Sequence, residues 1–254
     1  MLKLSRWFSL ALKSSLYTTI SSNLMMPRSA AFVWDFDGVI VLTPHEDAWR
    51  LACEHWGIRG FSHEFYSRYV SGRPRLEGAR NILENLAPHL LAERGGSVVE
   101  EFAEYKTRVY LRLVEEGRYS VNWGVVSFIC KARAGGITQV LASASRNVLV
   151  LAERVRVGGL KLAELFDADV SGKGSSKREV FRRALQEVFS RVRSAECIVF
   201  FDDSPAGVEA AKEAGGKAVG CFDEGLASYG ADLVVKDFSL WEPAELLEAV
   251  GCRA

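Results

Sequence analysis

Short apolar runs that end in acidic or hydroxyl residues constrain the fold of this chain more than any other feature. The runs, with the polar residues that follow them, are 31–34 with Asp35 and Asp37, 137–142 with Ser143, and 197–201 with Asp202 and Asp203. Such runs are typical of buried strands, and open α/β sheets bind their ligands at the carboxyl ends of the strands. These polar residues are therefore predicted to meet at one edge of a sheet.

Helical segments alternate with apolar runs from about residue 122 onward. The further apolar runs are 168–170, 217–221 and 232–235. This alternation predicts right-handed βαβ units, and hence an α/β fold with a Rossmann-like parallel sheet and helices on both faces. We expect this core to comprise residues 31–42 and 122–254.

Residues 43–121 have a different composition, rich in aromatic and charged residues. Helical spacing predicts helices over 48–56, 63–70, 76–86 and 98–116. Because this block follows the first strand of the sheet, it is expected to form an α-helical cap domain inserted into the core.

Residues 1–30 are predicted to be an N-terminal extension outside the catalytic fold. They contain lysines and arginines but no acidic residue, which is typical of a targeting segment. Met25 and Met26, just before the first strand, favour instead a start codon assigned too far upstream. The apolar run 7–12 is too short to span a bilayer.

The composition is that of a soluble enzyme without a nucleic-acid or membrane partner. The 32 basic and 32 acidic residues give a formal net charge of zero, so no bulk attraction to either partner is expected. The five cysteines are scattered and odd in number. They indicate buried free thiols in a reducing, cytoplasmic compartment rather than disulfides or a zinc site. No obligate protein partner is indicated.

The first acidic pair suits phosphoryl transfer. Alternate residues of an extended chain share a face, so Asp35 and Asp37 can reach the same pocket. Asp35 can attack phosphorus as a covalent nucleophile, and Asp37 can donate and accept the proton. Asp202 and Asp203 supply further oxygen ligands, so that Mg²⁺ is the expected cofactor.

A lysine is required to neutralise charge at such a centre, and two positions are open. Lys177 begins the predicted helix 178–188, whereas Lys173 lies in the Gly/Ser turn before it.

These segments resemble the four motifs of the haloacid dehalogenase-like (HAD) phosphohydrolase superfamily, in the same order, over about residues 31 to 240. The resemblance implies that Asp35 is the nucleophile and Asp37 the acid and base, with the backbone carbonyl of Asp37 as a metal ligand. It also implies that Ser143 and a lysine bind the phosphoryl group, and that Asp203, assisted by Asp202, binds Mg²⁺. For the lysine, Lys177 is favoured because it lies four residues before Phe181, as in the family pattern, and Lys173 is the alternative. The dehalogenase members lack the second acid of the first motif, so Asp37 argues against that branch.

Finer features resemble β-phosphoglucomutases and related sugar phosphatases. The segment Ser143-Ala144-Ser145-Arg146-Asn147 is similar to their second motif, which implies that Ser145, Arg146 and Asn147 contact the distal part of the substrate. The cap segment 71–75 resembles the loop whose arginine binds a second phosphate, here Arg75. His45, in a His-x-x-Ala-Trp pattern, and Lys106, four residues before Tyr110, match two further cap residues of that subfamily.

The expected function is therefore that of a Mg²⁺-dependent phosphatase. It would hydrolyse a small phosphorylated metabolite, a sugar phosphate, through an aspartyl-phosphate intermediate. The alternative is a β-phosphoglucomutase-type isomerase, which returns the phosphoryl group to sugar instead of water. A third reading, a non-catalytic binding protein on this fold, would be favoured by loss of an acid at position 35, 37 or 203, and all three acids are present.

Overall fold

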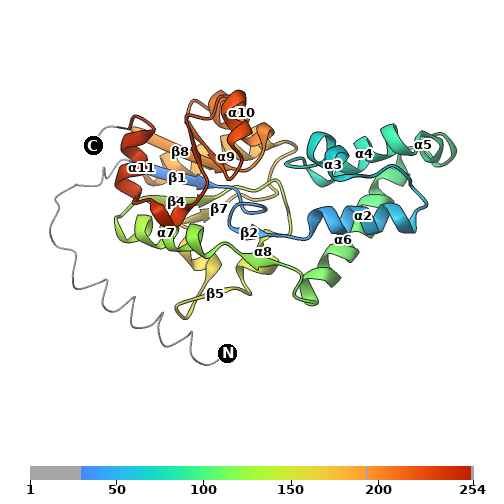
Figure 1. The fold of residues 1–254 in the computed structure, drawn as a ribbon, viewed down its shortest axis with the longest axis horizontal. Helices are drawn as coiled ribbons and strands as arrows, with labels where there is room; N and C mark the ends of the chain where they lie inside the picture. Colours follow the sequence, from blue (N-terminus) through green and yellow to red (C-terminus); the bar gives the residue numbers. More distant parts are fainter. Residues whose placement is uncertain (1–29, 193, 253–254) are drawn as a thin grey trace.

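The core is built on a six-stranded parallel sheet (Figure 1). In the computed structural model, which describes residues 30–192 and 194–252, the strand order is β10-β9-β8-β1-β4-β7. The strands are β1 (Ala30–Trp34), β4 (Thr138–Leu141), β7 (Ala168–Asp169), β8 (Cys197–Asp202), β9 (Lys217–Cys221) and β10 (Leu233–Val235). Each of the six apolar runs predicted as strands forms one of these strands. The predicted α/β, Rossmann-like fold class is confirmed.

Strand β1 lies between β8 and β4. Val33 is paired with Val140 on one side and with Phe200 on the other. Because the three strands are parallel and neighbouring, the residues that follow them emerge side by side at one edge of the sheet. This arrangement brings three distant parts of the sequence to a common site.

Helices cover both faces of the sheet, as the alternation along β1 requires. Ala30, Phe32 and Trp34 belong to one hydrophobic cluster, whereas Ala31 and Val33 belong to another. The first cluster includes residues of α7 (Trp123–Ala134), α8 (Val148–Ala152) and α11 (Pro243–Ala249), and the second includes residues of α9 (Lys177–Arg191) and α10 (Pro205–Glu213). Such a double-sided core is expected for a strand that is apolar at every position.

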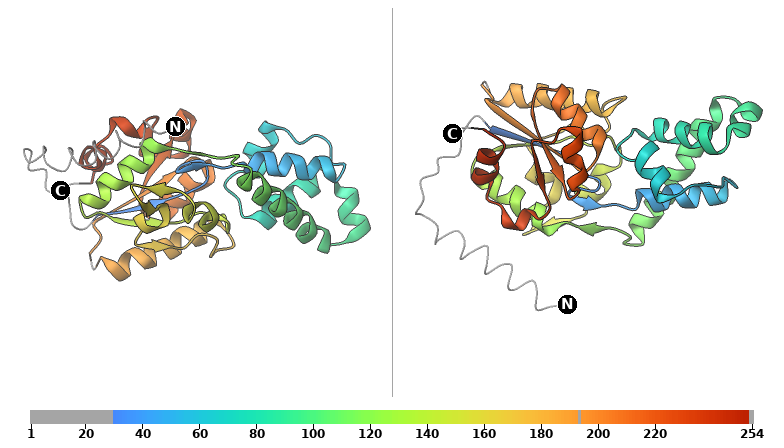
Figure 2. Two further views of the ribbon diagram at one scale, coloured as in Figure 1. Left: turned by 90° about the horizontal axis from the view of Figure 1, so that it is seen from below. Right: turned by 45° about the horizontal axis from the view of Figure 1, so that its top comes forward.

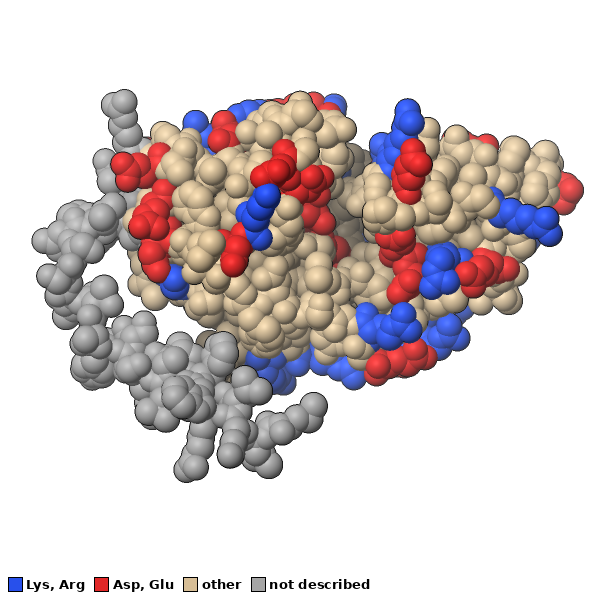
Figure 3. Space-filling view, in the orientation of Figure 1, with Lys and Arg blue, Asp and Glu red and all other residues tan. Residues whose placement is uncertain are grey.

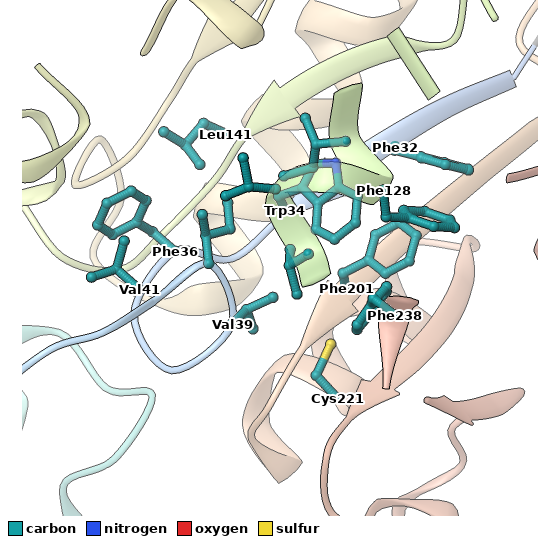
Figure 4. Packing of buried hydrophobic residues seen from close by; sticks show 14 of the residues in the cluster. Phe32, Trp34, Phe36, Val39, Val41, Phe128, Leu141, Phe201, Cys221 and Phe238 are labelled. Carbon is teal, nitrogen blue, oxygen red and sulfur yellow. The ribbon is translucent and has the colours of Figure 1, made fainter. Parts of the chain in front are cut away.

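Aromatic residues pack directly behind the site-bearing strand ends (Figure 4). The rings of Trp34 and Phe201 are stacked with centroids 3.8 Å apart, and Phe128 and Phe238 pack around them. The indole N–H of Trp34 donates to Oε1 of Gln139 at 2.7 Å, so this buried polar group has a hydrogen-bond partner. Since Trp34 precedes Asp35 and Phe201 precedes Asp202, this packing fixes the backbone from which both carboxylates project.

A cluster of helices is inserted after β1 and forms the cap (Figure 2). The helices are α2 (His45–His55), α3 (His63–Tyr69), α4 (Arg75–Leu86), α5 (Pro88–Arg94) and α6 (Ser97–Glu115). They enclose a hydrophobic cluster of their own, which contains Trp49, Ile82 and Phe102. The sequence patterns predicted these helices apart from α5, which follows α4 after a single residue, Ala87.

The chain enters and leaves the cap through two short paired strands. In this antiparallel ribbon, β2 (Val41–Leu42) pairs with β3 (Ser120–Val121). The remaining elements are β5 (Arg156–Val157), β6 (Leu160–Lys161), η1 (Leu162–Leu165), η2 (Glu224–Tyr229) and η3 (Phe238–Leu240). None of the helices within the described ranges is long and apolar enough to cross a membrane. Residues 1–29 of the predicted extension lie outside the residues that the structure describes. Ala30, its last residue, begins β1.

The prediction of free thiols is wrong for one cysteine pair. Cys197, at the start of β8, forms a disulfide with Cys252, with a Cα–Cα distance of 5.8 Å. Cys53, Cys130 and Cys221 are free. The two bonded residues are 55 positions apart, and only the packing of the C-terminal segment against the sheet brings them together. Spacing along the sequence carries no signal of such a pair.

Candidate active site

Asp35 projects from the carboxyl end of β1, where a sharp turn begins. Its backbone N–H donates to the carbonyl of Phe201 at 2.9 Å, which continues the pairing of β1 with β8 by one residue. Gly38 has a φ of +84°, and a Cβ atom there would lie 1.9 Å from Oδ2 of Asp203. The Asp-x-Asp-Gly segment thus needs glycine both for its turn and for the close approach of the second acidic pair.

Lys177 joins the first acidic segment to the second. Its ammonium lies 2.7 Å from Oδ2 of Asp35 and 2.8 Å from Oδ2 of Asp202. The side chain is only 4% exposed; burial lowers the pKa of Lys177, but the two carboxylates more than offset this and hold it above its usual range. Lys177 is the first residue of α9, and the Ser176 hydroxyl caps that helix.

Lys173 lies elsewhere. Its ammonium donates to the backbone carbonyl of Asp169 at 2.6 Å on an exposed loop. Of the two lysines considered from the sequence, the structure therefore brings Lys177 to the carboxylates.

Three acidic side chains form a possible cation site. Oxygen atoms of Asp35, Asp202 and Asp203 lie within 4.8 Å of one another. Oδ1 of Asp35 is buried and has no hydrogen-bond partner among the described residues. Burial raises the pKa of Asp35 to about 7 despite Lys177, and burial together with Asp202 raises that of Asp203 well above its usual value. Crowded carboxylates with an unpaired oxygen fit a hard divalent cation such as Mg²⁺.

Asp202 is held rigidly in this cluster by Ser204. The backbone N–H and the hydroxyl of Ser204 both donate to Oδ1 of Asp202, at 2.9 and 2.7 Å. The same hydroxyl accepts the N–H of Gly207 at 3.1 Å, at the beginning of α10. Ser204 thus both caps α10 and orients the carboxylate of Asp202.

The carboxylate of Asp37 has different neighbours. Oδ2 accepts the Ser143 hydroxyl at 3.1 Å, and Oδ1 lies 3.2 Å from Nε2 of His45. Burial alone would raise the pKa of Asp37, but contact with His45 and the hydroxyls of Thr43 and Ser143 lowers it to about 2. Asp37 is therefore ionised in the substrate-free site. Its carboxylate is separate from the three-acid cluster.

Cap residues hold His45 in this position. Nδ1 of His45 lies 2.6 Å from the ammonium of Lys106, and the His45 ring stacks on Tyr110 at 4.3 Å. Lys106 also lies 5.0 Å from the ring of Trp49. Burial lowers the pKa of Lys106 to about 7. Burial, and after it the positive charge of Lys106, lowers the pKa of His45. With Lys106 donating to Nδ1, a neutral imidazole carries its proton on Nε2, the ring nitrogen closer to Asp37.

The loop after β4 presents hydroxyl, guanidinium and amide groups in succession. The Ser143 hydroxyl accepts the N–H of Ser145 at 3.2 Å, and the Ser145 hydroxyl accepts the N–H of Asn147 at 3.2 Å. Asn147 immediately precedes α8, but its side chain makes no capping hydrogen bond. Arg146 is exposed. None of the last three residues contacts the acidic cluster directly.

Arg75 is the first residue of α4 and is braced within the cap. Its Nη1 donates to the Thr107 hydroxyl at 3.0 Å. It makes no direct contact with the catalytic-candidate carboxylates. The surface of the molecule is hollowed between core and cap, where the cap faces the sheet edge (Figure 3).

Sequence reasoning missed three residues that contact the site. Thr43 helps to lower the pKa of Asp37, Ser204 orients Asp202, and Tyr110 stacks on His45. Ser204 had a local signal, since a hydroxyl directly after an acidic pair and before Pro205 is typical of a helix N-cap. The other two contacts depend on how the cap packs on the core.

Comparison with known proteins identifies the class to which this fold and site belong. The family model of haloacid dehalogenase-like hydrolases matches residues 30–215. The chain therefore belongs to the haloacid dehalogenase-like hydrolase family.

Individual relatives are named for sugar-phosphate chemistry. A phosphorylated carbohydrates phosphatase of Thermotoga maritima is 27% identical over 226 residues, which cover 87% of this chain and 97% of that protein. A β-phosphoglucomutase of Bacillus subtilis is 28% identical, over 82% of this chain and 90% of its own. The crystal structure of an archaeal β-phosphoglucomutase from Pyrococcus sp. strain ST 04 is 37% identical, with a TM-score of 0.74 over 87% of this chain and 99% of that chain.

Proposed function

We propose that this protein is a Mg²⁺-dependent phosphatase that acts on a small phosphorylated sugar. The observation that carries the proposal is the placement of Lys177 between Asp35 and Asp202, with Asp203 in the same cluster. Phosphoryl transfer requires a nucleophilic carboxylate, a buried positive charge such as the Lys177 ammonium, and further oxygen ligands. Positive charge is needed because the transition state spreads negative charge over the equatorial oxygens. The names of the relatives support the choice of a sugar phosphate as the substrate class.

The reaction begins with attack of an Asp35 oxygen on phosphorus. The bond from phosphorus to the sugar oxygen breaks, and an aspartyl phosphate forms. A phosphate dianion close to Asp37 raises its low pKa, so that Asp37 takes up a proton from solvent when the substrate binds. Asp37 then gives this proton to the leaving oxygen. Asp37 then takes a proton from water, whose oxygen attacks phosphorus and releases inorganic phosphate and free Asp35.

The remaining residues neutralise negative charge and orient the phosphoryl group. The Ser143 hydroxyl and nearby N–H groups bind a phosphoryl oxygen, and Lys177 offsets negative charge on Asp35 and on the phosphoryl group. Asp35, Asp202 and Asp203 would hold Mg²⁺, together with the backbone carbonyl of Asp37. When bound, the cation supplies additional charge neutralisation for the phosphoryl oxygens.

A direct test is a screen of hexose 1-phosphates, hexose 6-phosphates and pentose 5-phosphates, in Mg²⁺ and in excess EDTA. Phosphate release from at least one sugar phosphate is expected in Mg²⁺ and should vanish in EDTA. Asp203→Ala is expected to weaken Mg²⁺ activation more than Asp202→Ala does, measured as the Mg²⁺ concentration at half-maximal rate. Undiminished rates in excess EDTA would exclude the metal-dependent mechanism.

A β-phosphoglucomutase activity is the second candidate, favoured by the contact between cap and catalytic centre. His45 of the cap touches Asp37 of the core, so closure of the cap completes the proton-transfer group and limits access of water. Isomerisation of a hexose phosphate, faster than phosphate release in the same reaction mixture, would identify the mutase.

Arg75 is proposed to bind a distal group of the substrate. Arg75→Ala is expected to lower kcat/KM for the preferred sugar phosphate by about tenfold to a thousandfold, because a charge-assisted hydrogen bond is lost. Hydrolysis of p-nitrophenyl phosphate, which has no distal polar group of this kind, should change far less. The matched control is Arg73→Ala, since Arg73 pairs with Glu77 on the cap surface. Equal losses on both substrates would assign Arg75 to cap folding instead.

The location in the cell stays a prediction from composition, namely the cytoplasm. No nucleic acid, membrane or obligate protein partner is proposed.

A further inference from the structure

Strand β7 ends beside the loop that carries Ser143. It is the edge strand of the sheet and pairs in parallel with β4, with Asp169 opposite Leu141 (Figure 1). The N–H of Val170 donates to the carbonyl of Leu141 at 2.9 Å, which continues this pairing by one residue. The segment after β7 therefore runs alongside the segment after β4.

The N–H of Ser143 departs from this regular pairing. In a continuing parallel ladder the carbonyl of Val170 would accept that N–H. The carbonyl of Val170 instead accepts the N–H of Lys173 at 3.2 Å, because the chain turns there. The N–H of Ser143 donates to the hydroxyl oxygen of Ser171 at 3.1 Å. The side chain of Ser171 thus takes the place of a backbone acceptor.

The carbonyl of Ser143 is bonded to the next residue of the same segment. It accepts the N–H of Gly172 at 2.9 Å. Gly172 has a φ of +67°, and a Cβ atom there would lie 2.6 Å from Cγ of Arg146. The two loops are therefore in close contact, and both backbone polar groups of Ser143 are bonded to residues 171 and 172.

Ser171 is itself anchored to the edge strand. Its N–H donates to Oδ1 of Asp169 at 2.7 Å, and Asp169 is the last residue of β7. The hydroxyl that holds Ser143 is thus carried by a segment that a strand residue fixes, as precise placement of a neighbouring group requires.

The orientation of the Ser143 side chain depends on its backbone. Ser143 is only 2% exposed, and its hydroxyl donates to Oδ2 of Asp37 at 3.1 Å and accepts the N–H of Ser145 at 3.2 Å. Only one torsion angle separates this oxygen from the backbone, so a shift of the backbone moves the hydroxyl. Without the Ser171 hydroxyl, the buried N–H of Ser143 would lack an acceptor, and such a group favours a backbone shift toward a new partner.

We propose that Ser171 is a positioning residue of the active site, whose hydroxyl holds the backbone of Ser143 and thereby directs the Ser143 hydroxyl at Asp37 and at the phosphoryl group. This inference rests on the proposed phosphatase or mutase function, in which Ser143 binds a phosphoryl oxygen. Ser171 itself touches neither the substrate nor the cation.

The first test compares Ser171→Ala with the wild-type protein on two substrates. A loss of about tenfold in kcat/KM is expected both for p-nitrophenyl phosphate and for the panel sugar phosphate with the highest wild-type kcat/KM, because both carry the phosphoryl group that Ser143 binds. Ser171→Thr keeps the hydroxyl and should stay within about threefold of wild type. Ser175→Ala is the matched control, since Ser175 is exposed and bonds to Glu179 in the same segment. It should stay within about twofold.

Two further measurements separate positioning from a general effect on folding. In the substrate-free protein, hydrogen exchange of the Ser143 amide, followed by NMR, should be at least about tenfold faster in Ser171→Ala and unchanged in Ser175→Ala. In a Ser143→Ala background, Ser171→Ala should lower kcat/KM by less than about twofold further, because the hydroxyl that it positions is already absent.

Three outcomes would overturn the inference while leaving the proposed function intact. They are an unchanged exchange rate of the Ser143 amide, a further tenfold loss in the Ser143→Ala background, and a loss confined to the sugar phosphate. Absence of Mg²⁺-dependent phosphate release or isomerisation by the wild-type protein would instead overturn the proposed function, and with it the role of Ser171, whatever the exchange rate of the Ser143 amide.

Discussion

Replacing Asp35 by asparagine is expected to reduce turnover by roughly four orders of magnitude or more. The amide has the size of the carboxylate but is a very poor nucleophile, so no aspartyl phosphate can form. Initial rates of phosphate release, or of isomerisation, from the best sugar phosphate give the comparison. The melting temperature should not fall. Because the pKa of Asp35 is raised in the folded protein, its ionised form lowers the stability of the fold at pH values above about 4, and the neutral asparagine does not carry this cost.

Asp223→Asn provides the control for this experiment. Asp223 lies just beyond β9, near the same edge of the sheet, but it is exposed and accepts only the N–H of Gly225 at 2.8 Å. Its substitution should leave the rate within about twofold of wild type. A rate for Asp35→Asn within tenfold of wild type would rule out Asp35 as the nucleophile.

Replacing Lys177 by methionine is expected to reduce both stability and activity. Methionine keeps the unbranched shape but leaves the carboxylates of Asp35 and Asp202 facing each other without a cation, and breaking a buried ion pair costs about 3–5 kcal/mol. In EDTA the melting temperature should fall by roughly 10 °C. Mg²⁺ should restore part of this loss, because the metal neutralises the same carboxylates. At saturating Mg²⁺ the rate should still be at least about a hundredfold below wild type.

Lys173→Met separates the two lysines of this segment. Lys173 is exposed and bonds to a backbone carbonyl, so its substitution should change the melting temperature by no more than about 1 °C and leave the rate near wild type. A larger loss of activity in Lys173→Met than in Lys177→Met would transfer the proposed role to Lys173.

The sheet edge could be predicted from the sequence because its signals are local. An apolar run followed by polar residues defines a strand and its end, and parallel pairing then places Asp35, Ser143 and Asp202 together without knowledge of any side-chain contact. The cap helices were predictable for the same reason, since α2 and α6 repeat apolar residues at helical spacing.

Other parts of the site depend on contacts between segments that no local pattern encodes. The approach of His45 to Asp37 depends on how the cap is placed against the core, and the chain between them passes through the β2–β3 ribbon, whose strands have two residues each. Gly72, in the loop after α3, approaches Ser204 only through the packing of the cap on the core. Such contacts are set by tertiary packing, where sequence spacing gives no information.

The disulfide between Cys197 and Cys252 makes the C-terminal part of the core a covalent ring. The ring contains β8, β9, β10 and α11, and with them both acids of the second pair. Closing a loop of 55 residues removes enough freedom from the unfolded chain to stabilise the fold by about 4 kcal/mol. The terminal helix, which in most domains is the first element to fray, is thereby tied to the strand that presents Asp202. The durability of the proposed cation site thus depends on the thiol–disulfide balance of its surroundings, although no cysteine lies among the proposed ligands.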